Sequence, residues 1–504
     1  MIKSESNLSG IGVASIAKNT GYLIGTSGIN VIVRFVYALA LAHYLGPELY
    51  GLLNYGISWY LAFLSITGLG IAIILSREIG RDRNNGPRIV SLTLTVRIFI
   101  TIIAALACGI LGWFFESNAE ARSLLLMFTL ALIGRSFTIW TESVFTGYEE
   151  NRFTFRLQAI FRTLEVVVGT TVLFIGYGVT AIATVHAISW WLQAVSGIIL
   201  ARRYLVAVRL NLAWNGIKHI LISGLPLGLG VIMIQWLQSG TIVLYRHMAS
   251  SEYSLGQLAL AMQTFIIISS IPMAAGIASL PVLSRSIERR DGKDLLFSAT
   301  MMKASIILGA AFGLAGLGLG PWLVDAIFGI RYVEAGKLLG LAIWLSIPFS
   351  CGGSLTKVYL ARDQFFLPTI CAGAGALGLT LTIPWFVSVM DTSGAILAAG
   401  TGMGVWAISL IWMLARSGDL DVVQTVFKPL FVVVIALGTF IVLKTVSIVL
   451  AVLASWTVLF SGVFLFSILT KDERYLLGVL KKKWFPSRSG KIDSVISHVK
   501  DHQK

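Results

Sequence analysis

The sequence contains little charge and few residues that could bind a metal or form disulfides. Charged residues make up 12% of the 504 positions, and there are only three cysteines and six histidines. Cys108, Cys351 and Cys371 all fall in apolar runs without metal-ligand spacing, which argues against a zinc centre or a disulfide framework. No G-x-x-x-x-G-K-[ST] phosphate loop occurs, and no polar segment is long enough for a nucleotide-binding domain. We therefore expect no metal, no cofactor and no ATP hydrolysis.

Long apolar runs dominate the chain instead. Hydrophobic residues make up 56% of it, and the mean hydropathy is +0.83, far above that of a soluble globular domain. Runs of about 18 to 25 apolar residues each suffice to cross a bilayer as a helix. The sequence thus predicts an all-α, polytopic membrane protein with about 14 transmembrane helices. The predicted spans are 20–41, 52–75, 89–114, 123–146, 157–176, 180–201, 219–245, 256–283, 295–324, 337–358, 366–387, 393–415, 428–444 and 448–470.

The formal net charge of +15 predicts orientation in the membrane and not a nucleic-acid partner. With the N-terminus placed in the cytoplasm, the cytoplasmic segments together with the adjoining ends of the spans hold 29 Lys and Arg residues, and the outer loops together with the adjoining ends of the spans hold 5. This excess follows the positive-inside rule, so we expect both termini in the cytoplasm. No cleavable signal peptide is visible, since the first apolar run is long enough to remain as a span.

An internal repeat suggests two related halves. The segment GIAIILSREIGRD from Gly70 recurs as GIASLPVLSRSIERRD from Gly276, and six predicted spans separate the copies. Equal orientation of the copies predicts a pseudo-twofold axis along the membrane normal, with the substrate site between the halves. The predicted organisation is a leader (1–19), an N-lobe of six spans (20–201), a linker (202–218), a C-lobe of six spans (219–415), a helix pair (428–470) and a basic tail (471–504).

Four basic residues inside predicted spans are candidate substrate-binding groups. Arg34 and Arg135 lie near mid-span, where a charge costs about 2.5–3.5 kcal/mol on insertion scales. A guanidinium held at that depth suits a phosphate in a water-filled cavity. Arg97 and Lys303 lie closer to the cytoplasmic ends of their spans, so they could line a cavity entrance or simply extend to the interface.

Ionisable groups of the N-lobe are candidates for coupling transport to an ion gradient. Glu142 and Glu165 could take up a proton or Na⁺, and His186 could take up a proton. Spacing offers a structural alternative, because Arg135 and Glu142 share a helix face, as do Arg162 and Glu165, so both acids could belong to internal ion pairs. A hydrogen-bonded interior histidine is the corresponding alternative for His186.

Aromatic and amide side chains complete the candidate substrate site. Trp140 lies inside its span between Arg135 and Glu142, whereas Trp190 and Trp191 are expected among the interface aromatics. Gln235 and Gln238 occupy about the place in span seven that Arg34 has in span one. They are candidates for a neutral counterpart of Arg34 in the second half.

Four segments stand out, in order along the chain: LAHYLGPELYGLLNY (41–55), FTGYEENRF (145–153), GLPLGLG (224–230) and IFGIRYVEAG (327–336). Together they resemble the polysaccharide-biosynthesis flippases of the multidrug/oligosaccharidyl-lipid/polysaccharide exporter superfamily. The resemblance implies a two-lobed helical transporter that works by alternating access. It implies that an undecaprenyl-pyrophosphate-linked oligosaccharide is flipped from the cytoplasmic to the outer leaflet of a bacterial inner membrane. It also implies the lipid bilayer and other membrane proteins of polysaccharide assembly as partners.

Two alternatives are weighed against this flippase. A cation-coupled multidrug exporter of the same superfamily would hold its substrate with carboxylates, but the residues inside the spans comprise five bases, two acids and one histidine. A lipid-linked sugar polymerase or ligase would need catalytic groups on an outer loop, and the longest predicted outer loop has about eleven residues. The sequence therefore favours a flippase over a drug exporter and a transporter over an enzyme.

Overall fold

The computed structural model describes residues 3–269, 293–418, 420–470 and 473, and this part of the chain is helical without any strand. The principal helices are α1 (Lys3–Ile66), α2 (Ile71–Arg81), α3 (Gly86–Phe115), α4 (Ala119–Gly147), α5 (Asn151–Phe174), α6 (Val179–Tyr204), α7 (Trp214–Arg246), α9 (Lys293–Phe328), α10 (Val333–Ala342), α11 (Ser346–Ala361), α12 (Phe366–Arg416), α13 (Lys428–Leu443) and α14 (Ile448–Leu465). Residues 252–269 are also helical.

Two of the long helices are each broken in the middle. In α1 the break lies at Gly46 (φ 72°), a left-handed conformation that glycine adopts without steric cost, and Pro47 follows it. In α12 the break lies at Asp391 (φ 48°), whose carboxylate accepts hydrogen bonds from the Tyr245 hydroxyl at 2.6 Å and the Ser250 hydroxyl at 3.2 Å. These bonds hold a backbone conformation that is unfavourable for a residue with a Cβ.

Eleven of the described helices are long and apolar enough to cross a membrane. Two of them contain the breaks at Gly46 and Asp391, and each of these matches two predicted spans. The prediction of an all-α, multi-pass membrane protein is confirmed. The predicted span 256–283 is described only as far as residue 269.

The second predicted span, 52–75, is wrong at its end. Helix α1 stops at Ile66, and α2 begins after a turn that ends at Gly70 (φ 66°). A Cβ on Gly70 would lie 2.9 Å from the carbonyl oxygen of Gly224 on α7, so the turn approaches α7 more closely than a larger residue would permit. Hydropathy missed this break because the residues on both sides of it are apolar.

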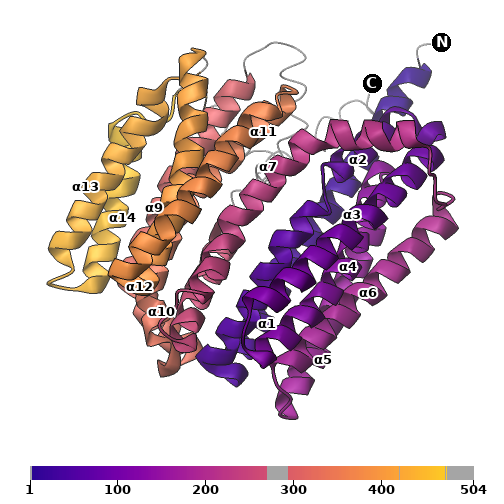
Figure 1. The fold of residues 1–504 in the computed structure, drawn as a ribbon. Coiled ribbons are helices and arrows are strands. Elements are labelled where there is room, and N and C mark those ends of the chain that lie inside the picture. The colour runs from indigo at the N-terminus through magenta and orange to yellow at the C-terminus, as the bar shows by residue number, and fades with distance from the viewer. Residues whose placement is uncertain (1–2, 270–292, 419, 471–472, 474–504) are drawn as a thin grey trace, which may run out of the picture.

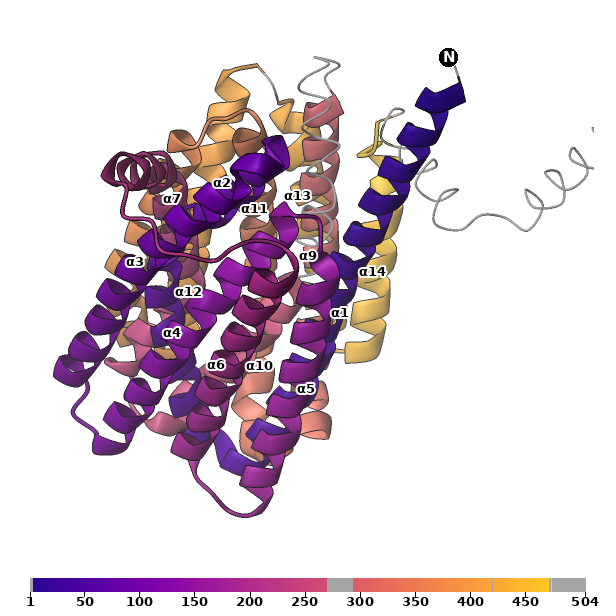
Figure 2. The same cartoon turned by 90° about the vertical axis from the view of Figure 1, so that its right-hand side faces the viewer.

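The helices form two groups with α7 between them (Figure 1). Helices α3 to α6 lie together on one side, and α9 to α14 lie on the other, where α13 and α14 form an adjacent pair against α9 (Figure 1). Helix α7 contacts both α12 and α1, while α1 runs beside α5 (Figure 2). The second copy of the sequence repeat, from Gly276, lies outside the described residues, so the pseudo-twofold axis stays a prediction. The basic tail also lies outside them, apart from residue 473.

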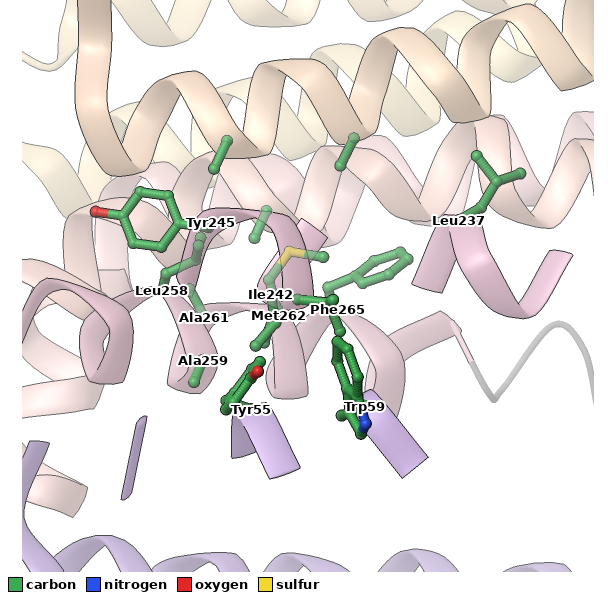
Figure 3. Packing of buried hydrophobic residues seen from close by; sticks show 14 of the residues in the cluster. Tyr55, Trp59, Leu237, Ile242, Tyr245, Leu258, Ala259, Ala261, Met262 and Phe265 are labelled. Carbon is green, nitrogen blue, oxygen red and sulfur yellow. The ribbon is translucent and has the colours of Figure 1, made fainter. Parts of the chain in front are cut away.

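Apolar side chains connect the two groups near the second half of α1. Figure 3 shows Tyr55 and Trp59 of α1 beside Met262 and Phe265 of the 252–269 helix, with Tyr245 of α7 nearby. All five side chains are buried. This cluster joins helices from both halves of the sequence and contributes to their association by removing aromatic surface from the surroundings.

The groups also meet closely at the end of the molecule away from the N-terminus. A Cβ on Gly256 would lie 1.9 Å from the carbonyl oxygen of Pro47, so the two backbones touch. Arg246, in the last turn of α7, pairs with Glu116 at the end of α3, with an Nε–Oε2 distance of 3.2 Å. We call this contact region the closed end, defined by Pro47, Glu116, Arg246 and Gly256.

Candidate functional site

A connected set of polar side chains lies among α1, α4, α5 and α6. Residues three, four or seven positions apart on a helix lie on one face, and this spacing brings the members of the set together. Helix α4 places Arg135 and Glu142 seven residues apart, and α5 places its three members four and three residues apart. We call this set the N-terminal polar network. Its members are Arg34, Tyr60, Arg135, Glu142, Gln158, Arg162, Glu165, His186, Ser189, Trp190 and Gln193.

Arg135 is a half-buried cation without a carboxylate partner among the described residues. Its Nη1 donates to the Tyr60 hydroxyl at 2.6 Å. Its Cζ lies 4.7 Å from the ring centre of Trp190 and 5.8 Å from that of Tyr60, and its buried Nε has no hydrogen-bond partner. Aromatic faces attract a guanidinium but leave its formal charge in place, so Arg135 retains both charge and a donor for an anion.

Arg34 lies close to Arg135 but is exposed. It interacts electrostatically with Arg135, Arg162, Tyr60 and Glu165, although no ion pair forms between it and any described carboxylate. The structure therefore places the two arginines of the predicted site in one neighbourhood, with Arg34 at its accessible side. Such a pair of like charges is stable only with solvent or an anion beside it.

Arg162 and Glu165 form the internal ion pair that their spacing allowed. Their side chains make a direct contact and are both buried, and Arg162 also donates to the Ser189 hydroxyl at 2.9 Å and to Gln193 Oε1 at 3.1 Å. The second carboxylate oxygen of Glu165 lies 2.5 Å from His186 Nδ1. Arg162 is thereby neutralised, unlike Arg135.

The hydrogen bonds of His186 assign its proton. Trp190 Nε1 donates to His186 Nε2 at 3.0 Å, so Nε2 acts as an acceptor, and the Tyr60 hydroxyl lies 3.0 Å from the same nitrogen. The ring proton then belongs on Nδ1 and is donated to Glu165. His186 is a hydrogen-bonded interior histidine that links Tyr60 to Glu165.

Glu142 has a different environment from Glu165. Its Oε1 accepts hydrogen bonds from two amides, Gln158 Nε2 at 2.5 Å and Gln193 Nε2 at 3.4 Å, and no cation is in direct contact with it within the described residues. Counting the charged members of the network gives three arginines against two glutamates, an excess of one positive charge. The two acids are therefore chemically distinct, and Glu142 is the one that lacks direct compensation.

Arg97 and Trp140 lie outside this network. Arg97 is 1% exposed, and its guanidinium donates to two backbone carbonyls, those of Thr67 at 2.6 Å and Ser136 at 2.6 and 3.1 Å. Trp140 is also buried, and its Nε1 donates to the Thr93 hydroxyl at 3.2 Å. Arg97 thus links α3 to α4 and to the turn after α1, and the structure gives neither residue access to a ligand in the network.

Lys303 has a carboxylate partner that sequence spacing did not indicate. Its Nζ lies 2.9 and 2.8 Å from the two carboxylate oxygens of Glu473, and both side chains are at most 2% exposed. The Thr300 hydroxyl also donates to Glu473, at 3.3 Å. Arg97 and Lys303, which were both candidates for lining a cavity entrance, have different partners: Lys303 forms a buried ion pair, and Arg97 binds backbone carbonyls.

The remaining sequence-predicted candidates lie on α7, outside the network. Gln235 donates to the Ser239 hydroxyl of its own helix at 2.7 Å, and Gln238 is half-buried. Trp190, expected at the membrane interface, is instead 6% exposed and central to the network. Sequence reasoning also missed Tyr60 and Gln193. Gln193 could have been found, because it lies seven residues after His186 and so shares its helix face.

Within the described part of the chain, no group of three or more His, Cys, Asp or Glu side chains is arranged to hold a metal ion. The chemistry of the network is instead that of an anion site. Arg135, which has no carboxylate partner among the described residues, lies against the rings of Trp190 and Tyr60, and the exposed Arg34 interacts with it electrostatically.

Comparisons with known proteins identify the family of the chain and proteins of similar fold. The family model described as "Polysaccharide biosynthesis protein" matches residues 16–287. The fold is similar to that of the lipid II flippase MurJ in an inward closed conformation, with a TM-score of 0.66 and 15% identity over 88% of this chain and 98% of that one. No curated protein sequence gives a significant match.

Two further solved structures show the same fold. An inward-facing multidrug resistance MATE transporter of the MOP superfamily has a TM-score of 0.60 and 16% identity, over 77% of this chain and 98% of that one. A MOP superfamily transporter from Pyrococcus furiosus, whose binding pocket is described as having reverse polarity, has a TM-score of 0.58 and 16% identity, over 80% and 95%.

Proposed function

Because the chain belongs to the polysaccharide biosynthesis protein family, we propose that it flips an undecaprenyl-pyrophosphate-linked oligosaccharide repeat unit from the cytoplasmic to the outer leaflet. The broader class is established by the family match and the fold: a multi-pass transporter of the MOP superfamily. The observation that carries the finer proposal is the Arg135 guanidinium, which lies close to Arg34 and has no carboxylate partner within the described part of the chain.

A pyrophosphate diester matches the charge of this pair. Each of its phosphates carries one negative charge, and each guanidinium can donate two parallel hydrogen bonds to phosphate oxygens. Arg162 is not available in the same way, because Glu165 already compensates it. Arg34 and Arg135 would therefore bind one phosphate each, with Arg34 on the exposed side from which the headgroup enters.

The same charges argue against the alternatives. A cationic drug placed beside Arg34 and Arg135 would meet repulsion of like charges, and Glu165 is held by Arg162 and His186. A polymerase or ligase would need a nucleophile or general base directed at the substrate. The family and the structural neighbours are transporters or flippases, which favours transport over catalysis.

Orientation follows from the charge of the loops. With both termini in the cytoplasm of a bacterial inner membrane, the closed end with Glu116 and Arg246 faces outward. The substrate would then enter from the cytoplasmic side and leave when the closed end separates. For the return step we propose Glu142 as the proton-binding group, because amides and not cations contact it directly.

Complementation of a strain that lacks its glycan flippase tests the anion site. We expect Arg34→Ala and Arg135→Ala to abolish export of the lipid-linked glycan while the protein still accumulates in the membrane. Arg135→Lys should rescue only partly, since an ammonium keeps the charge but lacks the forked geometry. Arg203→Ala is the matched control, because Arg203 is an exposed arginine at the end of α6. Full export by both alanine variants would refute the assignment.

A second assay separates flippase from drug exporter. Purified protein in vesicles would be given either a pyrophosphate-linked saccharide or a cationic dye. We expect movement of the saccharide and none of the dye. Dye efflux without saccharide movement would instead identify a multidrug exporter.

A further inference from the structure

Trp190 is the side chain around which the N-terminal polar network is arranged. The Cζ atoms of two arginines lie over its indole, that of Arg162 at 3.7 Å and that of Arg135 at 4.7 Å from the ring centre. Its Nε1 donates to His186 Nε2 at 3.0 Å, and the residue is 6% exposed. An aromatic residue of the membrane interface would direct its N–H toward water. Trp190 therefore serves the network and not the interface.

Close packing of α6 on α4 fixes the position of this ring relative to Arg135. A Cβ on Gly134 would lie 2.9 Å from the carbonyl carbon of Trp190 and 2.8 Å from the backbone nitrogen of Trp191. The Thr138 hydroxyl also donates to the Trp190 carbonyl oxygen at 3.3 Å. Since Gly134 directly precedes Arg135, backbone contact places the indole beside the root of the Arg135 side chain.

The two arginines on this ring have different partners. Arg162 pairs with Glu165, whereas Arg135 donates to Tyr60 and pairs with no described carboxylate. Yet Arg135 and Glu165 are connected through only two groups, since Tyr60 contacts His186 and His186 contacts Glu165. A guanidinium that could turn toward Glu165 would gain an ion pair there beside Arg162 and His186.

We propose that Trp190 is a positioning residue that keeps Arg135 from pairing with Glu165, so that the guanidinium stays available to an anionic ligand. Its ring attracts Arg135 by a cation–π interaction and occupies space beside Arg162. The inference rests on the proposed function, because it concerns how the proposed pyrophosphate site is kept open.

Binding of inorganic pyrophosphate to the purified full-length protein tests this role by calorimetry. We expect Trp190→Leu to weaken binding about tenfold, because the ring is lost, and Trp190→Phe to stay within about threefold of the wild type, because a ring remains. Trp191→Leu is the matched control. Its indole donates to the Leu130 carbonyl oxygen at 3.0 Å and is not part of the network, so we expect unchanged affinity. In transport, Trp190→Leu should raise KM and leave the maximal rate nearly unchanged.

A double variant distinguishes positioning from packing. In Trp190→Leu/Glu165→Gln the competing carboxylate is gone, so pyrophosphate binding should equal that of Glu165→Gln alone, in which Arg162 is freed as well, and should exceed that of Trp190→Leu. Equal loss in the single and double variants, or equal affinity of Trp190→Leu and wild type, would overturn the proposal. If Trp190→Leu does not fold, Trp190→Met supplies a side chain of similar length without a ring, with the same expectations.

Arg135→Gln in the same assay separates this inference from the proposed function. Loss of binding in Arg135→Gln with normal binding in Trp190→Leu would overturn only the role of Trp190. Normal binding of pyrophosphate by Arg135→Gln would refute the anion site itself.

Discussion

Charged side chains inside helices α1 to α6 and inside helices α9 to α14 differ in how they are compensated. In the first group, three arginines, two glutamates and a histidine from four helices share one network, and Arg135 remains without a carboxylate. In the described part of the second group, the two fully buried charges, Lys303 and Glu473, compensate each other, while Lys357 of α11 is half-buried like Arg135. An uncompensated buried charge is costly, whereas a closed ion pair has no capacity left for a ligand. This comparison supports placing the proposed anion site in the first group.

The same contrast applies within the first group. Arg97 is as deeply buried as Lys303, but backbone carbonyls satisfy it. Arg135 is less buried and incompletely satisfied, since its Nε has no partner. Depth in the membrane therefore does not identify a ligand-binding arginine. Within the described residues, Arg135 differs from Arg97 and Arg162 because it has neither a backbone carbonyl nor a carboxylate as a partner, and this difference supports its proposed role.

The largest expected effect concerns the compensated pair of the second group. Lys303→Met leaves Glu473 buried without a cation, and breaking one side of such a pair costs about 3–5 kcal/mol of stability. The double variant Lys303→Met/Glu473→Leu should regain most of that stability. Unfolding of the purified protein in detergent micelles would measure both values, with transport per folded molecule as the second observable.

Lys303 has a structural role only if the double variant also transports. A double variant that folds as well as the wild type but shows no transport would assign Lys303 to the substrate path. The contrast between the two groups of helices would then no longer hold.

A smaller effect on stability is expected for substitution of Arg97, which donates hydrogen bonds to backbone carbonyls. Arg97→Met leaves the Thr67 carbonyl without its donor, for which we expect a loss of about 1–3 kcal/mol. Because Arg97 contacts no member of the polar network, the KM for the lipid-linked saccharide should stay the same. Thermal unfolding and transport kinetics on the same preparation would test this. A raised KM at unchanged stability would instead place Arg97 in the binding path.

The sequence was sufficient for the class of protein. Apolar runs predicted the helices, including the paired segments around Gly46 and Asp391, and mid-span position singled out Arg34 and Arg135. The sequence was insufficient to predict the partners of charged side chains that lie far apart along the chain. Glu473 follows Lys303 by 170 residues, and nothing in the spacing of either indicates the other.

Trp190 shows a second reason for the limits of sequence analysis. Its position near other aromatics is typical of a membrane interface, and hydropathy does not report on which face of α6 it lies. The face is determined by contact with Gly134 on α4, a tertiary feature. The break after Ile66 escaped prediction for a similar reason, because the close approach of Gly70 to α7 and not a change in polarity accounts for it.

The smallest effect on pyrophosphate binding is expected for substitution of Glu142, the carboxylate that accepts hydrogen bonds from two side-chain amides. Glu142→Gln keeps a side chain of the same shape and removes the proton-binding group, so pyrophosphate affinity should change less than about twofold. The groups that face Glu142 are Gln158 and Arg162 of α5, Gln193 of α6 and Arg135 of its own helix. Loss of one negative charge among them leaves the arginines in place.

Transport by Glu142→Gln should nevertheless lose its dependence on an imposed proton gradient, measured in vesicles with the wild type in parallel. Glu165→Gln is the informative comparison, since it leaves Arg162 and His186 without their acceptor and should alter binding as well. If Glu142→Gln retains the full response to the gradient, Glu142 is not the coupling group. The two acids would then differ in environment without differing in function, and the coupling ion would have to bind elsewhere.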